Sequence, residues 1–153
     1  MANQNGPLTA LPEELLKVLR EPCAVLVTTI VPESGLPANN LISWAYAPSE
    51  SAVRIATDSK GLVARNVREN GKMLVTIFAA GACWSIEGGA RIISDELQGC
   101  QLKLACSELS IEAVRNITFW GGVITAAPQF DVTYDKALKE KLDGQVMTAL
   151  HSL

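Results

Sequence analysis

Six short β-rich segments, with a single helical segment lodged among them, constrain the fold of this chain more than any other feature. Their spans are residues 23–30, 39–46, 52–57, 72–78, 84–93 and 101–115. In the last of these, residues 109–114 could also be helical, and a long strand is the favoured reading. Turns containing glycine or proline separate several of the segments, as expected for hairpins. We therefore predict a mainly β protein whose six antiparallel strands form a small split β-barrel with flanking helices, because closure removes exposed strand edges.

Helices are expected at both ends of this β-rich region. Residues 12–20 begin with Pro12 and two acidic residues, which suits a helix N-terminus, and Pro22 stops the segment. Asp135 is a suitable N-cap for a final helix over about residues 135–151. The length of 153 residues and the lack of an internal repeat predict one domain over residues 1–153.

Gly88 and Gly89 interrupt the fifth predicted strand. Paired glycines inside a strand indicate either a β-bulge or the close approach of another backbone, and the bulge is the commoner cause. The second predicted strand is uninterrupted. Its period-2 alternation places four larger side chains on one face: Asn40, Ile42, Trp44 and Tyr46.

Charge and composition exclude several classes of partner. The chain has 13 basic and 16 acidic residues, and the basic ones are spread along it, so no concentrated basic face is expected to bind nucleic acid. No apolar run approaches the ~20 residues that span a bilayer. The N-terminus lacks the basic and apolar parts of a signal peptide, so we expect a cytoplasmic protein without a membrane partner.

Histidine and cysteine usage argues against a metal site. The one histidine, His151, lies close to the C-terminus, and the four cysteines form no C-x-x-C pair. We expect reduced thiols that serve as small hydrophobic side chains. No side chain can be assigned as catalytic from the sequence, and any catalysis is expected to depend on a cofactor.

A phosphate site is predicted where the third strand passes into the internal helix, expected over residues 59–70. The first N–H groups of a helix have no intrahelical partner and carry partial positive charge. Ser59 can cap the helix or donate a hydrogen bond, and Lys60 and Arg65 supply full charges. An ordinary capped surface helix would show the same residues, so this pattern alone is not specific.

The order of these features resembles the flavin-binding split barrels, the relatives of pyridoxamine 5′-phosphate oxidase. The residues that carry the resemblance are Gly35-Leu36-Pro37 in the first hairpin, the helix that ends at Asn70-Gly71, and Gly88-Gly89-Ala90-Arg91 in the fifth strand. The similarity covers roughly residues 11–95. No one of these motifs is specific, and their order and spacing carry the comparison.

The resemblance implies a homodimer with FMN bound between its subunits, and a flavin-dependent oxidoreductase activity. Transferred position by position, the second strand would lie along the flavin, and the turn after the third strand would hold its phosphate. The cofactor-binding residues implied in this way are Asn40, Ile42, Ser43, Thr57, Ser59, Lys60 and Arg65.

Three departures from the family pattern limit what can be transferred. Asn40 stands where these oxidases usually have an arginine for the phosphate, and Lys60 lies ten residues before Asn70, whereas the family's Ser-x-Lys lies about eight before it. Phosphate binding is therefore expected to depend on Lys60 and Arg65. The C-terminus lacks the family's Arg-x-His stretch, so we do not expect oxidation of pyridoxamine phosphate.

Two questions stay open at this level. The chain is either an FMN-dependent oxidoreductase with another substrate, or a non-catalytic module that sequesters flavin or heme as a dimer, since fold does not establish reaction class. Phe119, Trp120 and Tyr134 either stack over a flavin or pack the C-terminal helix onto the barrel. The packing role is the favoured reading, because large aromatic side chains bury area wherever they lie.

Overall fold

The computed structural model describes residues 6–153, so the first five residues of the expected domain lie outside it. Those residues form a mainly β protein. None of its helices is both long and apolar enough to cross a membrane. The elements are α1 (Glu13–Val18), β1 (Val25–Ile30), β2 (Pro37–Ile42), β3 (Ala45–Ser49), β4 (Ala52–Asp58), α2 (Leu62–Asn70), β5 (Lys72–Ala79), β6 (Ala82–Ser94), β7 (Leu104–Asn116) and α3 (Lys136–His151).

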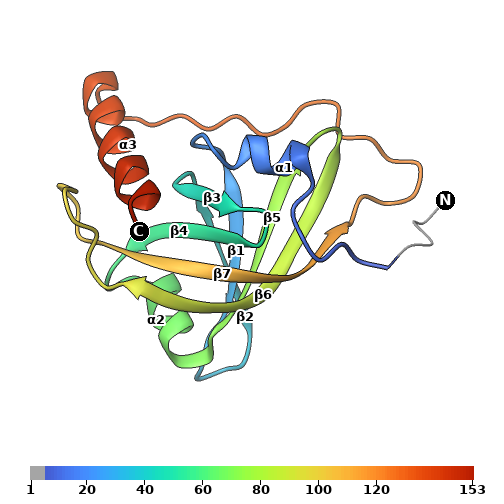
Figure 1. The fold of residues 1–153 in the computed structure, drawn as a ribbon, viewed down its shortest axis with the longest axis horizontal. Helices are drawn as coiled ribbons and strands as arrows, with labels where there is room; N and C mark the ends of the chain where they lie inside the picture. Colours follow the sequence, from blue (N-terminus) through green and yellow to red (C-terminus); the bar gives the residue numbers. More distant parts are fainter. Residues whose placement is uncertain (1–5) are drawn as a thin grey trace.

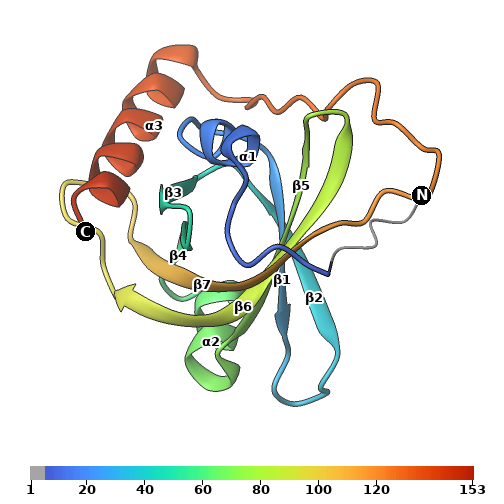
Figure 2. The ribbon, with the colours of Figure 1, turned by 45° about the vertical axis from the view of Figure 1, so that its right-hand side comes forward.

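All seven strands form one antiparallel sheet in the order β2-β1-β5-β6-β7-β4-β3. The sheet curls on itself, so that its two edge strands, β2 and β3, come round toward each other (Figures 1 and 2). These edge strands follow each other in the chain and are joined only through Ser43 and Trp44. Within residues 6–153 no ladder pairs β2 with β3, which leaves the barrel split at this corner.

The predicted strand over residues 39–46 is therefore two strands, and the sheet has seven strands rather than six. The backbone changes partner between two consecutive residues: Ser43 O accepts from Cys23 N at 3.2 Å, and Trp44 O accepts from Ala56 N at 3.0 Å. A strand that leaves one neighbour for another must turn between them. The corner is that turn.

The corner also changes which side chains face the barrel interior. Ile42 packs against the interior core, and so does Ala45, although a regular strand would place these two on opposite faces. Trp44 and Tyr46 consequently lie outside the barrel, beneath α3. The predicted common face for Asn40, Ile42, Trp44 and Tyr46 is wrong beyond Ile42 for this reason.

The barrel interior holds the main core, and two helices close it. Leu15 and Leu19, in and just after α1, are fully buried. Val63 and Val67 of α2 join the same core, and α2 packs against β1, β4, β6 and β7. In Figure 2 this helix lies across the lower end of the barrel, next to the end of β4.

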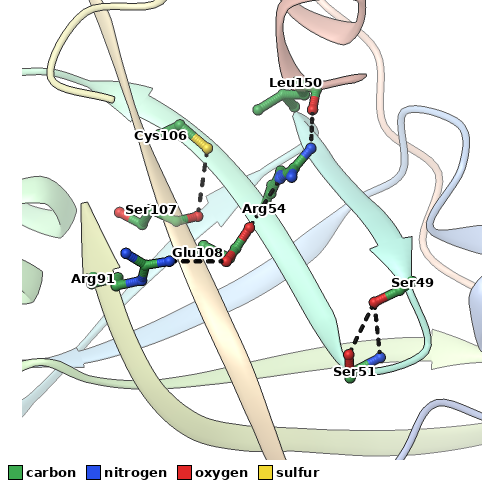
Figure 3. Close-up of polar contacts among 8 residues, drawn as sticks. All are labelled: Ser49, Ser51, Arg54, Arg91, Cys106, Ser107, Glu108 and Leu150. Carbon is green, nitrogen blue, oxygen red and sulfur yellow. Dashed lines mark hydrogen bonds and ion pairs between the residues drawn. The ribbon is translucent and has the colours of Figure 1, made fainter. Parts of the chain in front are cut away.

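Helix α3 packs outside the barrel against β3 and β4, where Leu142, Val146 and Leu150 are buried. Its N-cap is Asp135, as predicted, whose side chain accepts from Leu138 N. A half-buried ion pair fixes its last turn. Arg54 Nε donates to Glu108 Oε2 at 3.0 Å and Arg54 Nη1 donates to Leu150 O at 2.7 Å (Figure 3).

The paired glycines occupy a bulge, as the commoner alternative predicted, and only one of them is sterically required. The β6–β7 register shifts between Glu87 and Gly88. A Cβ atom on Gly88 would lie 1.9 Å from Ser110 O, far inside contact distance, whereas one on Gly89 would meet only Gly71 O at 3.8 Å. The bulge thus presses the Gly88 backbone against β7.

Candidate functional site

The predicted cofactor residues lie on two strands and one turn near the split corner. Asn40 and Ile42 lie on β2, and Ser43 lies in the corner itself. Thr57 lies near the end of β4, and Ser59 and Lys60 follow in the turn before α2. β4 runs beside the corner, because Ala56 donates its N–H to Trp44. The structure therefore places Ile42 and Ser43 in one part of this region and Thr57, Ser59 and Lys60 in another.

A pocket of about 280 Å³ opens at the corner, and we call it the corner pocket. The residues before β1, the corner, the loop before α3 and the first turns of α3 all contribute to it. Most of the wall is apolar or aromatic, as is typical of small-molecule sites. The lining residues are Pro22, Cys23, Leu41, Ile42, Ser43, Trp44, Phe130, Val132, Tyr134, Lys139 and Asp143.

Charged groups in the corner pocket are paired with one another. Trp44 Nε1 donates to Asp143 Oδ1 at 2.8 Å, and Lys139 Nζ donates to Asp143 Oδ2 at 3.1 Å. The hydrogen bond and charge of Asp143 raise the pKa of Lys139, with smaller contributions from Asp131 and Tyr134. These bonds also attach α3 to the corner and hold the pocket wall in place.

Two of the predicted cofactor residues carry buried polar atoms without a protein partner. Asn40 Oδ1 and Thr57 Oγ1 are inaccessible to solvent and make no hydrogen bond among the described residues. Asn66 Oδ1 on α2 and Ser107 Oγ on β7 share this property. Buried polar atoms are nearly always satisfied, because an unmade bond costs about 1–3 kcal/mol. Such atoms on β2 and β4 are suited to a polar ligand.

The turn after β4 differs from its prediction. α2 begins at Leu62, and its N-cap is Gly61, which has no side chain to cap the helix. Ser59 does not cap the helix: its N–H donates to Lys103 O, and its carbonyl accepts from Arg68 Nη1. Asp58 stabilises a turn in place of a first helical turn at residues 58–60. Its carboxylate accepts a hydrogen bond from Lys60 N at 2.9 Å.

Two lysines lie at this turn without an ion pair within residues 6–153. Lys60 was predicted, and its side chain is exposed. Lys103 was not predicted, because it lies far along the chain, just before β7. The pairing of β4 with β7 and the bond from Ser59 N to Lys103 O bring it here. Sequence spacing carries no signal for such a pairing. Together they are the positive charges that a phosphate would meet beside the N-terminus of α2.

Arg65, predicted as a second phosphate charge, faces carboxylates. It forms ion pairs with Glu33 in the β1–β2 hairpin and with Glu69 one turn along α2. These pairs offset its charge and direct the guanidinium toward the hairpin. Arg68 is likewise engaged, by Asp95 at 3.1 Å. The structure therefore brings Lys60 and Lys103 to the turn and does not bring Arg65 to it.

Neither a family model nor a curated protein sequence matches the chain. Solved structures do match it. A candidate pyridoxamine 5′-phosphate oxidase from Lactobacillus delbrueckii aligns at 17% identity with a TM-score of 0.61, over 75% of this chain and 99% of the other. The fold is that of the pyridoxamine 5′-phosphate oxidase-like split barrels.

Two further structures show the range of proteins built on this split barrel. HupZ from Group A Streptococcus aligns at 14% identity with a TM-score of 0.59, over 76% of this chain and 99% of its own. An F420 reductase aligns at 14% identity with a TM-score of 0.57, over 69% and 98%. At such identities the likeness is one of fold, and the chemistry must be argued from the site.

The aromatic residues of the split barrel's long loop divide into two groups. Phe119 is 87% exposed and Trp120 is 69% exposed, so neither packs α3 onto the barrel, contrary to the favoured reading. Tyr134 lines the corner pocket. The loop itself is anchored at the β5–β6 turn, where Ile124 N donates to Gly81 O, and it runs from there to α3 (Figure 1). Trp44 and Tyr46, predicted elsewhere, make the contacts with α3.

Within the described residues, no group of three or more His, Cys, Asp or Glu side chains is arranged to hold a metal ion. Cys23 lines the corner pocket, and burial raises the pKa of its thiol to about 11, which keeps it protonated at neutral pH. His151 stacks on Tyr46 with ring centroids 4.0 Å apart. Neither group is placed as an activated nucleophile or base.

A second cavity of about 510 Å³ lies across β1, β5 and β6, next to the bulge. Thr28 and Leu74 line it, together with Gly88 and Gly89. It includes none of the predicted cofactor residues. It is larger than the corner pocket, and Glu87 at its side is paired with Arg115 at 3.0 Å.

Proposed function

We propose that the protein binds FMN at the split corner and acts as a homodimeric oxidoreductase on a substrate other than pyridoxamine phosphate. One observation carries this proposal. Asn40 Oδ1 on β2 and Thr57 Oγ1 on β4 are buried and make no hydrogen bond among the described residues, and the resemblance implies the flavin along β2 and its phosphate after β4. A bound ligand with polar edges would supply the missing hydrogen bonds.

The other residues of the region fit the parts of FMN. Lys60 and Lys103, beside the N-terminus of α2, would hold the phosphate. Ile42 and Ser43 would lie along the ring, with the apolar corner excluding water. When bound, FMN would supply the hydride and electron chemistry, and this chain would orient it and limit solvent access.

A non-catalytic binding module is the second candidate, and a specific observation favours it. Arg65 is paired with Glu33 and Glu69, so fewer charges face a phosphate than the sequence predicted. Among the described residues, the two charged side chains that line the corner pocket, Lys139 and Asp143, are bonded to each other. Such a module could hold flavin, or another flat ligand such as heme, without rapid electron transfer.

The first experiment is a visible absorption spectrum of the untagged protein, with and without added FMN, after gel filtration. A retained flavin spectrum at the size of a dimer supports the proposal, and failure to retain or titrate FMN contradicts it. A parallel titration with hemin tests the alternative ligand. Reduction of the bound flavin by NADH or NADPH then separates the enzyme from a sequestering module, because sequestration needs no rapid electron exchange.

Single substitutions test the phosphate position. Lys60→Ala and Lys103→Ala should each weaken FMN binding about tenfold, since a charge-assisted hydrogen bond contributes about 1.5 kcal/mol or more. Arg65→Ala should change it little, because its charge is already offset. Lys136→Ala on α3 is the control. If only the Arg65 variant weakens binding, the phosphate lies on the hairpin side of α2 instead.

A further inference from the structure

The corner pocket has no unpaired charge with which to recognise an ion. Lys139 Nζ bonds Asp143 Oδ2 at 3.1 Å, and Asp143 Oδ1 accepts from Trp44 Nε1 at 2.8 Å. Within residues 6–153 these are the two charged side chains that line the pocket, and they offset each other. A cationic ligand would be repelled by the lysine, and an anionic ligand would be repelled by the Asp143 carboxylate.

The corner pocket presents hydrogen-bond donors to a ligand, from Lys139, Tyr134 and Ser43. An ammonium group has three N–H donors and no acceptor, and only one donor of Lys139 is used by Asp143. The hydroxyl groups of Tyr134 and Ser43 have no protein partner among the described residues and can also donate. Both oxygens of Asp143 already accept bonds. A ligand that fits this set carries an acceptor and no charge.

The walls and the volume define the rest of the ligand. Leu41, Ile42 and Trp44 form apolar surface on the strand side, and Phe130 and Tyr134 add aromatic rings from the loop. Flat aromatic ligands are favoured between such rings. A cavity of about 150 Å³ accepts one benzene ring. The corner pocket, at about 280 Å³, has room for two fused rings.

We propose that the corner pocket binds an uncharged, planar, two-ring aromatic compound whose carbonyl oxygen accepts hydrogen bonds from Lys139 and Tyr134. That this compound is the substrate rests on the proposed function. That the pocket binds it does not, because the groups involved all belong to the pocket wall.

A matched series of two-ring probes tests the charge and the acceptor separately. The probes are 2-acetylnaphthalene, 2-naphthoate and 2-naphthylmethylammonium, titrated calorimetrically into the full-length protein with and without FMN. We expect 2-acetylnaphthalene to bind at least tenfold more tightly than either ion. Equal or tighter binding of an ion, or no binding of any probe, overturns the proposal.

Tyr134→Phe keeps the ring and removes the hydroxyl, at a position that is 41% exposed and therefore safe for folding. It should weaken 2-acetylnaphthalene binding about fivefold to tenfold and leave unsubstituted naphthalene unchanged. Lys139→Met should weaken it similarly, and Lys141→Met on the same helix should not. Unchanged binding in both Tyr134→Phe and Lys139→Met overturns the assigned hydrogen bonds.

The FMN titration separates this proposal from the proposed function. Binding of 2-acetylnaphthalene by a protein that does not bind FMN supports the pocket and contradicts the flavoprotein. Ile42 and Ser43 line the corner pocket and are also expected along the flavin ring, so the proposed ligand would lie against the ring, as a substrate does. Competition between the two ligands would show that the ring itself fills the corner pocket, which overturns a separate ligand there. Simultaneous binding supports both proposals.

Discussion

The Thr57 hydroxyl is buried and makes no hydrogen bond among the described residues. Replacing Thr57 by valine keeps the shape and the strand preference and removes the unpartnered oxygen. We expect Thr57→Val to leave the stability of the free protein unchanged or to raise it by up to about 1 kcal/mol, measured by urea unfolding. The same variant should bind FMN more weakly.

Thr57→Ser is the matched control, because it keeps the hydroxyl and loses only a methyl group. It should retain FMN affinity while losing about 1 kcal/mol of stability. A valine variant that is markedly less stable and binds FMN normally would mean that the hydroxyl serves the fold and not a ligand.

Cys106 makes stability depend on alkaline pH. Burial raises the pKa of its thiol to about 12, with Glu108 adding to the rise and Arg54 opposing it. The unfolded thiol titrates near pH ~8.5, so the unfolded chain loses this proton first. The stabilising contribution is complete below that pH and declines as the pH rises toward 12.

Comparison of the parent with Cys106→Ala isolates this effect from lysine and tyrosine titration. Between pH 7 and pH 10 the parent should lose about 2 kcal/mol more unfolding free energy than the variant, on the order of the linkage expected for that shift. Urea unfolding at both pH values measures the difference. If the parent and Cys106→Ala lose the same unfolding free energy between pH 7 and pH 10, the thiol is not insulated from solvent.

At the scale of single elements, the bulge in β6 offers a sharp pair of substitutions. Gly88→Ala places a Cβ atom against Ser110 O and should cost about 3 kcal/mol or more, or prevent folding. Gly89→Ala meets no such contact and should be neutral or stabilising by up to about 1 kcal/mol. Expression level and urea unfolding of the two variants measure the difference. Equal effects would contradict the close approach at Gly88.

Trp44 is the main link between the corner and α3. Trp44→Phe keeps most of the apolar contact and removes the N–H that donates to Asp143. We expect a loss of about 1.5–3 kcal/mol, because this hydrogen bond is made to a charged group. Hydrogen exchange should increase in α3 and remain unchanged in β5. A uniform increase would mean that α3 does not open separately from the barrel.

Local chemistry was enough to predict several elements. Asp135 caps α3 through its own side chain, and Gly71 ends α2 with φ of 69°, so neither needs a distant partner to be recognised. The long last strand was also predicted, because its alternation of Leu104, Cys106 and Glu108 is local. Signals of this kind are readable from a few neighbouring residues.

The corner and the turn after β4 could not be predicted in this way. Residues 39–46 all suit a strand, and the break depends on Cys23 and Ala56, which meet the corner only in the folded protein. The prediction that Ser59 caps the helix was wrong, because the Asp58 carboxylate bonds Lys60 N and keeps residues 58–60 in a turn. Lys103 reaches the site through strand pairing, and Arg65 is directed away by Glu33. Apart from the local turn at Asp58, each error reflects a contact between distant segments.

At the scale of the whole molecule, the exposed apolar residues of the loop after β7 are a candidate contact surface for a partner protein. Phe119, Trp120 and Val123 are each at least 69% exposed and lie within five consecutive residues of the chain. Contiguous exposed apolar residues are unusual on a monomer. If the protein is the proposed dimer, Phe119→Ser with Trp120→Ser should shift it toward monomer in sedimentation velocity.

Leu102→Ser is the control for that experiment. Leu102 is also an apolar side chain that is 39% exposed, but it lies before β7 in the chain, whereas the loop residues lie after it. This variant should leave the sedimentation coefficient unchanged. A double variant that remains dimeric would place the interface elsewhere on the sheet.

The order of the strands has a consequence for synthesis. β4 emerges early, but among the described residues its partners in the sheet are β3 and β7, and β7 ends at Asn116. Until β7 leaves the ribosome, the edge of β4 away from β3 is unpaired, and β1 and β5 are not joined to the β3–β4 hairpin through the sheet. Contacts this distant in the chain are slow to form. The barrel is therefore completed in one late step, and chains that stop before β7 should be recovered as targets of chaperones and proteases and not as a smaller folded protein.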